Sequence, residues 1–402
     1  MTAVTADATT TRATRSSVWW VGVAIVLVAA NLRPAVVGVA PMLAEIQASE
    51  GLSGTAAGVL TALPVLCFGL LAPAAPRLAR RFGIERALLG ALLLLCVGFA
   101  VRGIGPVSTL FAGTVLVGSA IAIGNVLLPS LIKRDFAHRT GVMTGLYTMA
   151  ISAGGALSAG VTVPLARAAG VDWRGGLGVW GLFALVAVAF WVPQLRRVDR
   201  RTGTGGARVT GLSRDPVAWQ VTAFMGLQSL GFYAAAAWLP AVFVDRGFTP
   251  AAAGWLLSLA SLVGIVGAMS APMLATRFRR QRLLAVGQTT LAGLGLLGVL
   301  ALPGAEVAAM TALGIGQGAA LGLALTLMAL RAPDAPHAAA LSGMAQSIGY
   351  VVAAAGPFTV GALHDVTGTW TWPLALLLAL LVPQAIVGAL AGRDRFVRSR
   401  PA

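Results

Sequence analysis

The sequence has 402 residues, of which 57% are hydrophobic and only 10% are charged, and its mean hydropathy is +0.85. This composition excludes an ordinary water-soluble domain of the same length. A net charge of +16 is typical of nucleic-acid-binding proteins, but here the basic residues lie in short loops between long apolar runs, so we expect no nucleic-acid partner.

Twelve apolar stretches follow one another along the chain, and each is long enough to cross a bilayer. A spanning helix needs about 20 residues, because without water every backbone group must be bonded within the segment. We therefore predict an all-α membrane protein that is embedded in the lipid bilayer. The predicted spans cover residues 18–42, 54–75, 84–104, 106–132, 140–168, 173–194, 216–243, 250–275, 282–302, 304–330, 337–363 and 370–391.

The loop charges predict the orientation of these spans. Of the 29 Lys and Arg residues, 24 fall on the side of the chain termini. Short basic loops stay in the cytoplasm, so we expect a multi-pass protein of the cell inner (plasma) membrane with both termini cytoplasmic. Arg33 alone falls deep inside a span, whereas Arg102, Arg167, Arg174 and Arg246 fall at or beyond the outer span edges and are counted with the loops on the other side.

The longest polar stretch, residues 196–215, is rich in Arg, Gly and Thr and is predicted to be a cytoplasmic linker. It divides the chain into two sets of six spans. The predicted organisation is a cytoplasmic tail at 1–17, a six-helix half at 18–195, the linker, a second half at 216–392 and a cytoplasmic tail at 393–402.

The two halves repeat one another in sequence. Residues 76–86 match residues 272–282 at six of eleven positions, and the same offset pairs Gly118 with Gly314. A shared bias toward Ala, Leu and Gly is the alternative explanation, but the matched Pro, Phe and Arg positions are not bias residues. The repeat predicts pseudo-two-fold symmetry, as in transporters that move one half against the other around a midplane site.

The topology and the loop at residues 76–86 resemble the major facilitator superfamily. The signature of that loop is Gly-x-x-x-Asp-Arg-x-Gly-x-Arg; Pro76 stands here for its glycine and Arg80 for its aspartate. The resemblance and the internal repeat imply that the gating residues of these loops are Arg81, Gly83, Arg86, Arg277 and Arg282.

A narrower resemblance covers nearly the whole chain. It rests on Asn-Leu-Arg-Pro at 31–34, on the run at 122–136, on Trp-Leu-Pro at 238–240 and on the segment at 314–325. These motifs are similar to those of the cyanate permease and 2-nitroimidazole transporter family. The resemblance implies two six-helix bundles, a central cavity lined by the first, fourth, seventh and tenth helices, and a carrier that functions as a monomer.

Each of those four helices carries an amide well inside its span, and the eleventh carries another. Buried amides are costly in a membrane unless they are paired, so they mark either a polar pathway or a bond between helices. We treat them as candidate substrate ligands and keep helix-to-helix bonding as the alternative. They are Asn31, Asn125, Gln228, Gln317 and Gln346.

Arg33 is the strongest candidate for contact with the substrate. An arginine at the centre of a span costs about 2.5–3.5 kcal/mol on insertion scales, so it must face protein or water. Its planar guanidinium suits carboxylate-like and other oxyanions. The alternatives are a structural arginine that binds carbonyls freed by Pro34, or one that snorkels outward.

The first span is predicted to break near Arg33. Asn31 and Arg33 lie about 200° apart on an ideal helix, so both can face one cavity only if the backbone deforms. Pro34 disfavours helical geometry at Arg33, which predicts a local break there.

The only three tyrosines all fall within spans. Tyr147 and Tyr233 are candidate substrate ligands, and Tyr350 shares a helix face with Gln346. A hydroxyl bonded to a neighbouring helix is the alternative role.

No Asp or Glu falls in the apolar centre of a span, so a proton pathway would use rim carboxylates such as Glu45 and Asp245, or the acid group of the substrate. The two cysteines, Cys67 and Cys96, lie in separate apolar stretches and offer no metal site. With no paired carboxylates and no metal cluster predicted inside the spans, we expect neither an enzyme nor a cofactor.

These features predict a secondary active transporter that imports a small polar or anionic solute by alternating access around a central cavity. A cyanate-like anion or a small nitrogen compound fits the interior arginine. The alternative is an efflux pump for small organic toxins or drugs such as nitroimidazoles.

Overall fold

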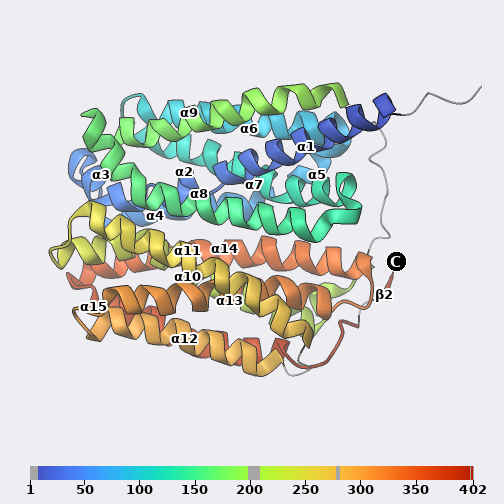
Figure 1. The fold of residues 1–402 in the computed structure, drawn as a ribbon. Helices are drawn as coiled ribbons and strands as arrows, with labels where there is room; N and C mark the ends of the chain where they lie inside the picture. The colour runs from blue at the N-terminus through green and yellow to red at the C-terminus, as the bar shows by residue number, and fades with distance from the viewer. Residues whose placement is uncertain (1–7, 198–208, 278–280, 399, 402) are drawn as a thin grey trace, which may run out of the picture.

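The computed structural model describes residues 8–197, 209–277, 281–398 and 400–401. Twelve helical stretches of this described chain are long and apolar enough to cross a membrane, which confirms the predicted number of spans. Figure 1 shows them as two layers, one running from blue to green and the other from yellow-green to red.

The first layer contains the elements of the N-terminal half. They are α1 (Ala8–Asn31), α2 (Pro34–Val37), η1 (Ala40–Met42), α3 (Leu43–Glu50), α4 (Gly54–Leu71), α5 (Ala74–Phe82), α6 (Ile84–Gly103), α7 (Val107–Asp135), η2 (Ala137–Arg139), α8 (Thr140–Ala169), α9 (Trp173–Trp191) and η3 (Val192–Arg197).

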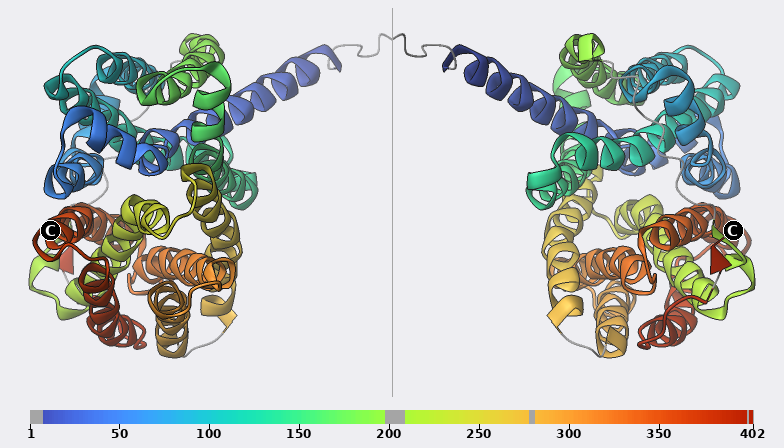
Figure 2. Two further views of the ribbon diagram at one scale, coloured as in Figure 1. Left: turned by 90° about the vertical axis from the view of Figure 1, so that its left-hand side faces the viewer. Right: turned by 90° about the vertical axis from the view of Figure 1, so that its right-hand side faces the viewer.

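The second layer contains the C-terminal half. Its elements are β1 (Val209–Thr210), η4 (Leu212–Arg214), α10 (Pro216–Asp245), α11 (Pro250–Arg277), α12 (Gln281–Ala301), α13 (Glu306–Leu330), α14 (Ala335–Thr367), α15 (Thr371–Ala391) and β2 (Arg400–Pro401). We call the end of the bundle at which α1 begins and α15 ends the terminal end, and the other end the opposite end (Figure 1). The right-hand view of Figure 2 looks at the terminal end and shows the two halves as separate groups of helices.

The halves meet where α4 packs on α14 and α8 packs on α11. Glycines let these helices approach backbone to backbone. A Cβ atom at Gly58 would lie 2.7 Å from the Pro357 carbonyl oxygen, and one at Gly254 would lie 2.3 Å from that of Ala159. Close approach of small residues is a general way to pack helices where lipid offers no hydrophobic driving force.

The first span is broken at the predicted place. Helix α1 ends at Asn31, Arg33 has φ −106° and ψ −34°, and α2 begins at Pro34, which has no N–H to continue the helix. The carbonyl oxygen of Ala35, just past the break, accepts a hydrogen bond of 2.8 Å from Nη1 of Arg102.

The assignment of Arg102 to a loop is wrong. It lies in the last turn of α6 and is only 3% exposed, and its Nε also donates to the Thr114 hydroxyl at 3.1 Å. A guanidinium can be buried only where acceptors meet it, and the broken first span supplies a free carbonyl. The spans therefore contain a second interior arginine, whose side chain binds a carbonyl next to the break.

The predicted tails and linker fall partly outside the described chain, at residues 1–7 and 198–208. Helix α1 begins at Ala8, before the predicted edge at residue 18. Within the last part of the predicted linker, β1 pairs antiparallel with β2, so the C-terminal segment returns to the start of α10.

Candidate functional site

Arg33 lies at the boundary between the two halves. Its guanidinium carbon is 4.8 Å from the ring centroid of Phe232 and 5.8 Å from that of Tyr233, both on α10 of the other half. The stem of Arg33 packs on α8, where a Cβ atom at Gly155 would lie 3.3 Å from the Arg33 Cβ. The break in the first span thus directs a cation of one half onto aromatic faces of the other, in the geometry of cation–π contacts.

Further aromatic rings extend this contact. The Phe68 ring on α4 lies 6.2 Å from Tyr233 and 5.7 Å from Tyr350 on α14, and the two tyrosine rings are 6.3 Å apart. Tyr147 on α8 lies within electrostatic range of Arg33 and of Tyr350. The structure brings together residues from five helical segments, which we call the Arg33 cluster: Arg33, Phe68, Tyr147, Phe232, Tyr233 and Tyr350.

The Arg33 cluster contains a positive charge and no negative charge. Among the described residues, no carboxylate oxygen lies within 4 Å of the Arg33 guanidinium, and Arg33 remains partly exposed. An unpaired cation in a medium of low dielectric attracts an anion strongly. The Ala35 carbonyl past the break is bound by Arg102 and so needs no bond from Arg33, whose contact with a substrate stays a prediction.

Two predicted amides turn back to their own helices. The Nδ2 atom of Asn31 donates to the Leu27 carbonyl at 2.8 Å, and Asn31 is 2% exposed. The Nε2 atom of Gln346 donates to the Ser342 hydroxyl at 2.7 Å. Asn125 lies half-buried on α7. Contact of these amides with a substrate stays a prediction.

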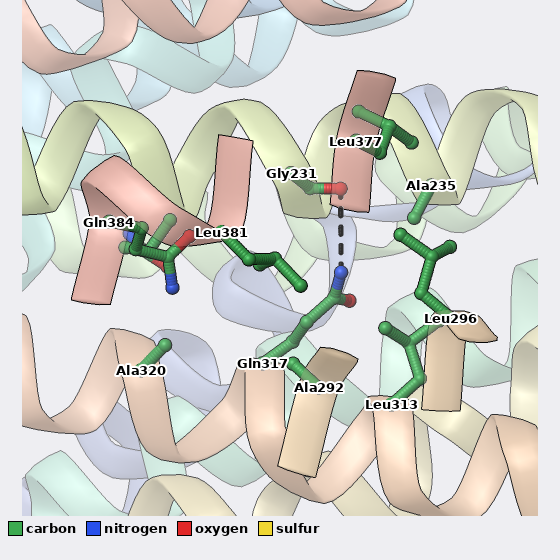
Figure 3. A pocket seen from close by; sticks show the side chains of 11 residues that line it. Gly231, Ala235, Ala292, Leu296, Leu313, Gln317, Ala320, Leu377, Leu381 and Gln384 are labelled. Atoms are coloured by element: carbon green, nitrogen blue, oxygen red, sulfur yellow. Dashed lines mark hydrogen bonds between the residues drawn. The ribbon is translucent and has the colours of Figure 1, made fainter. Parts of the chain in front are cut away.

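Gln228 and Gln317 instead line a small cavity inside the C-terminal half. The cavity has a volume of about 20 Å³ and is lined by α10, α12, α13 and α15, with Gln384 as its third amide. Figure 3 shows Gln317 reaching across it, and its Nε2 donates to the Gly231 carbonyl at 3.4 Å. A polar cavity above about 10–15 Å³ has room for one water molecule.

The predicted gating residues of the two repeat loops lie at the terminal end. Arg81, Arg86, Arg277 and Arg282 are exposed, and Gly83 has φ +87°, which allows the tight turn from α5 to α6. Their gating role stays a prediction.

The loop contacts that join helices come from residues the sequence analysis did not select. In the N-terminal half, Nη2 of Arg134 on α7 lies 2.5 Å from Oε1 of Glu85, whose side chain is 4% exposed. In the C-terminal half, Nη2 of Arg331 donates to Oε1 of Gln281 at 2.6 Å. The loop repeat aligns Glu85 with Gln281, so the sequence alone could have indicated that both residues bind an arginine at equivalent places in the two halves.

A second contact between the halves lies at the opposite end. The carboxylate of Asp365, in the last turn of α14, accepts hydrogen bonds from the backbone N–H of Gly54 at 2.8 Å and of Thr55 at 2.6 Å, and from the Thr55 hydroxyl at 2.7 Å. Gly54 and Thr55 open α4, so the carboxylate sits on a helix N-terminus, where negative charge is favoured. We call this contact the Asp365 latch.

The two rim carboxylates that the sequence suggested for proton coupling bind within their own halves. Glu45 accepts from the backbone N–H of Trp173 at 3.1 Å, and Asp245 accepts from the indole N–H of Trp370. Asp365, which the sequence analysis did not select, is the rim carboxylate that crosses between the halves. Asp365 lies two residues beyond the predicted end of its span, and nothing in the sequence indicates that it binds the other half.

Comparison with known proteins shows similarity along most of the chain. The sequence profile of the Major Facilitator Superfamily matches residues 19–357 and 225–401. The uncharacterized transporter YycB of Bacillus subtilis is 43% identical over 381 residues, which cover 94% of this chain and 95% of that protein. The 2-nitroimidazole transporter of Escherichia coli is 41% identical over 376 residues, covering 93% and 95%. The cyanate transport protein CynX of Escherichia coli is 32% identical over 368 residues, covering 89% and 94%.

Among solved structures, a bacterial homologue of the human lysosomal transporter Spinster, in an inward-facing and occupied conformation, matches with a TM-score of 0.80. It is 15% identical in sequence and covers 95% of this chain and 98% of its own. At this identity the match shows the shared fold.

Proposed function

Since the chain belongs to the major facilitator superfamily of membrane transporters, we propose that it carries a small polar or anionic solute across the bacterial inner membrane by alternating access, with Arg33 as the electrostatic anchor. The observation that carries this proposal is the unpaired, partly exposed guanidinium at the boundary between the halves. A solute held there touches both halves at once, as a site reached alternately from the two sides requires.

The proposal includes an orientation, with the terminal end in the cytoplasm. The charge tally supports it, because 24 of the 29 Lys and Arg residues belong to that side. The Asp365 latch and the close approach of Gly254 to Ala159 hold the halves together toward the opposite end. A substrate would then reach Arg33 from the cytoplasmic side in this conformation, like that of the inward-facing Spinster homologue.

Transport by the purified protein in liposomes tests the anchor. We expect Arg33→Ala to lower uptake of cyanate, nitrate or small carboxylates at least tenfold, because each charge-assisted hydrogen bond it removes is worth about 1.5–3 kcal/mol. Arg33→Lys should retain part of the activity, since it keeps the charge but loses the planar fork. Arg80→Ala, which removes an exposed arginine at the terminal end, is the matched control. Equal uptake of anions by Arg33→Ala and the parent protein would refute the proposal.

A second candidate function, efflux of small flat organic compounds, is favoured by the rings around Arg33. Aromatic faces stack on planar molecules, and a relative at 41% identity is named as a 2-nitroimidazole transporter. Accumulation in cells with and without the protein separates the two directions. Import predicts more solute inside the expressing cells, and efflux predicts less. For efflux, Phe232→Leu should weaken nitroimidazole transport while sparing small anions.

A further inference from the structure

A cavity of about 340 Å³ lies at the terminal end of the C-terminal half, away from the Arg33 cluster. It is a half-open cavity between the segment that precedes α10 and the segment that follows α15. Its charged lining consists of Arg214, Asp215, Arg395 and Arg398.

Backbone contacts fix the C-terminal segment over this cavity. The N–H of Arg398 donates to Oδ2 of Asp215 at 2.6 Å, and the N–H of Val397 donates to the Arg331 carbonyl at 2.9 Å. The Val397 side chain is 3% exposed and packs in one apolar cluster with Leu212. The cavity is therefore preformed by the fold.

The single carboxylate of the lining is already occupied. Oδ1 of Asp215 accepts from the backbone N–H groups of Val217 at 2.7 Å and Ala218 at 3.2 Å, and Oδ2 holds Arg398 N–H. Over the described chain, no carboxylate oxygen comes within 4 Å of the side chains of Arg214, Arg395 or Arg398. Three arginines and one carboxylate thus line one cavity, so its charged lining has a net charge of +2 (three Arg minus one Asp) and attracts an anion.

Exposed aromatic side chains of the kind found at a membrane interface lie near the cavity. Trp219, in the first turn of α10, is 45% exposed and donates its indole N–H to the Ser213 carbonyl at 2.8 Å. Phe396, on the cavity wall, is 54% exposed. Exposed tryptophan at a span end is typical of the membrane interface, and basic pockets there bind phospholipid headgroups.

We propose that this cavity binds a phosphate group, and that its place at the membrane surface makes an anionic phospholipid the source. Guanidinium forks match phosphate oxygens in geometry and charge. The site is independent of the transport pathway, so its test requires no knowledge of the transported solute.

Native mass spectrometry of the full-length protein in a neutral detergent tests the site with three probes: phosphatidylglycerol, phosphatidylcholine and inorganic phosphate. The test variant combines Arg214→Gln, Arg395→Gln and Arg398→Gln. Each charge-assisted bond from a guanidinium to a phosphate contributes about tenfold or more to binding, so the triple variant should bind phosphatidylglycerol at least about 100-fold more weakly. The triple Arg-to-Lys variant should keep most of the affinity and guards against loss of folding.

The control variant carries the same charge change at exposed arginines of the other half, Arg77→Gln, Arg80→Gln and Arg139→Gln. It should bind phosphatidylglycerol like the parent protein. Inorganic phosphate that binds as tightly as phosphatidylglycerol, and is lost in the test variant alone, assigns the site to soluble phosphate. The proposal is overturned if the control and test variants lose affinity for phosphatidylglycerol equally. It is also overturned if the parent protein binds phosphatidylglycerol no more tightly than phosphatidylcholine and does not bind inorganic phosphate.

Discussion

The Asp365 latch should control how readily the halves part at the opposite end of the bundle. The substitution Asp365→Asn keeps the size of the side chain but removes its charge and one acceptor oxygen. Hydrogen bonds to a charged group are worth about 1.5–3 kcal/mol and neutral ones about 0.5–1.5 kcal/mol. Asp365 accepts three such bonds but is exposed to solvent, so we reduce the expected loss to about 1–2 kcal/mol. This corresponds to a shift of about 5–30-fold in the equilibrium between latched and parted halves.

Distances between spin labels across the opposite end measure this shift. One label replaces Ala48 on α3 and the other replaces Val307 on α13, both exposed, in a background with Cys67→Ala and Cys96→Ala. We expect the Asp365→Asn variant to show a larger population at long distance than the parent protein, because the halves separate more often.

The matched control makes the same chemical change within one half. Asp245→Asn weakens the bond to the Trp370 indole, and both residues belong to the C-terminal half. The distance distribution of this control should match that of the parent. The reasoning fails if Asp365→Asn leaves the distribution unchanged, or if both variants change it alike.

Two further predictions concern helix packing and the loop ion pair. Gly58→Leu should destabilise the protein by about 1–3 kcal/mol, because the larger side chain would press α4 against the α14 backbone. The control Gly90→Leu has open space around it and should leave the temperature of thermal unfolding unchanged. Glu85→Ala should lower stability by about 1–2 kcal/mol, because it strips the buried carboxylate from Arg134, which keeps its second partner Asp135. Removal of that exposed partner by Asp135→Ala should cost less than about 1 kcal/mol; an equal loss in both variants would contradict the burial argument.

Several features of the site could be predicted from residues that are neighbours in sequence. The break in the first span follows from Pro34, whose ring and missing N–H act on the adjacent residues. The placement of an unpaired Arg33 away from lipid follows from the cost of a charge in hydrocarbon. Tyr147 and Tyr233 lie near Arg33, but the sequence offered no distance between them, and their contact with a substrate stays a prediction.

Other contacts had no local signal. Asp365 and Gly54 are 311 positions apart, and Arg102 reaches a carbonyl 67 positions away. Gln228 and Gln317 lie on helices that are apolar nearly all round, so periodicity could not tell whether they face the boundary or the interior of their own half.

The sequence by itself determined the number of spans, the internal repeat that relates the two halves and the point at which the first span breaks. These depend on composition, repetition and local backbone chemistry, which are present before any helix meets another. The tertiary structure alone decided that Arg33 meets the rings of the opposite half, that Arg102 satisfies the break, and that the C-terminal segment closes a basic cavity over α10. Such contacts depend on how each helix is rotated about its axis, and a helix surrounded by apolar residues specifies that rotation only through the helices packed against it.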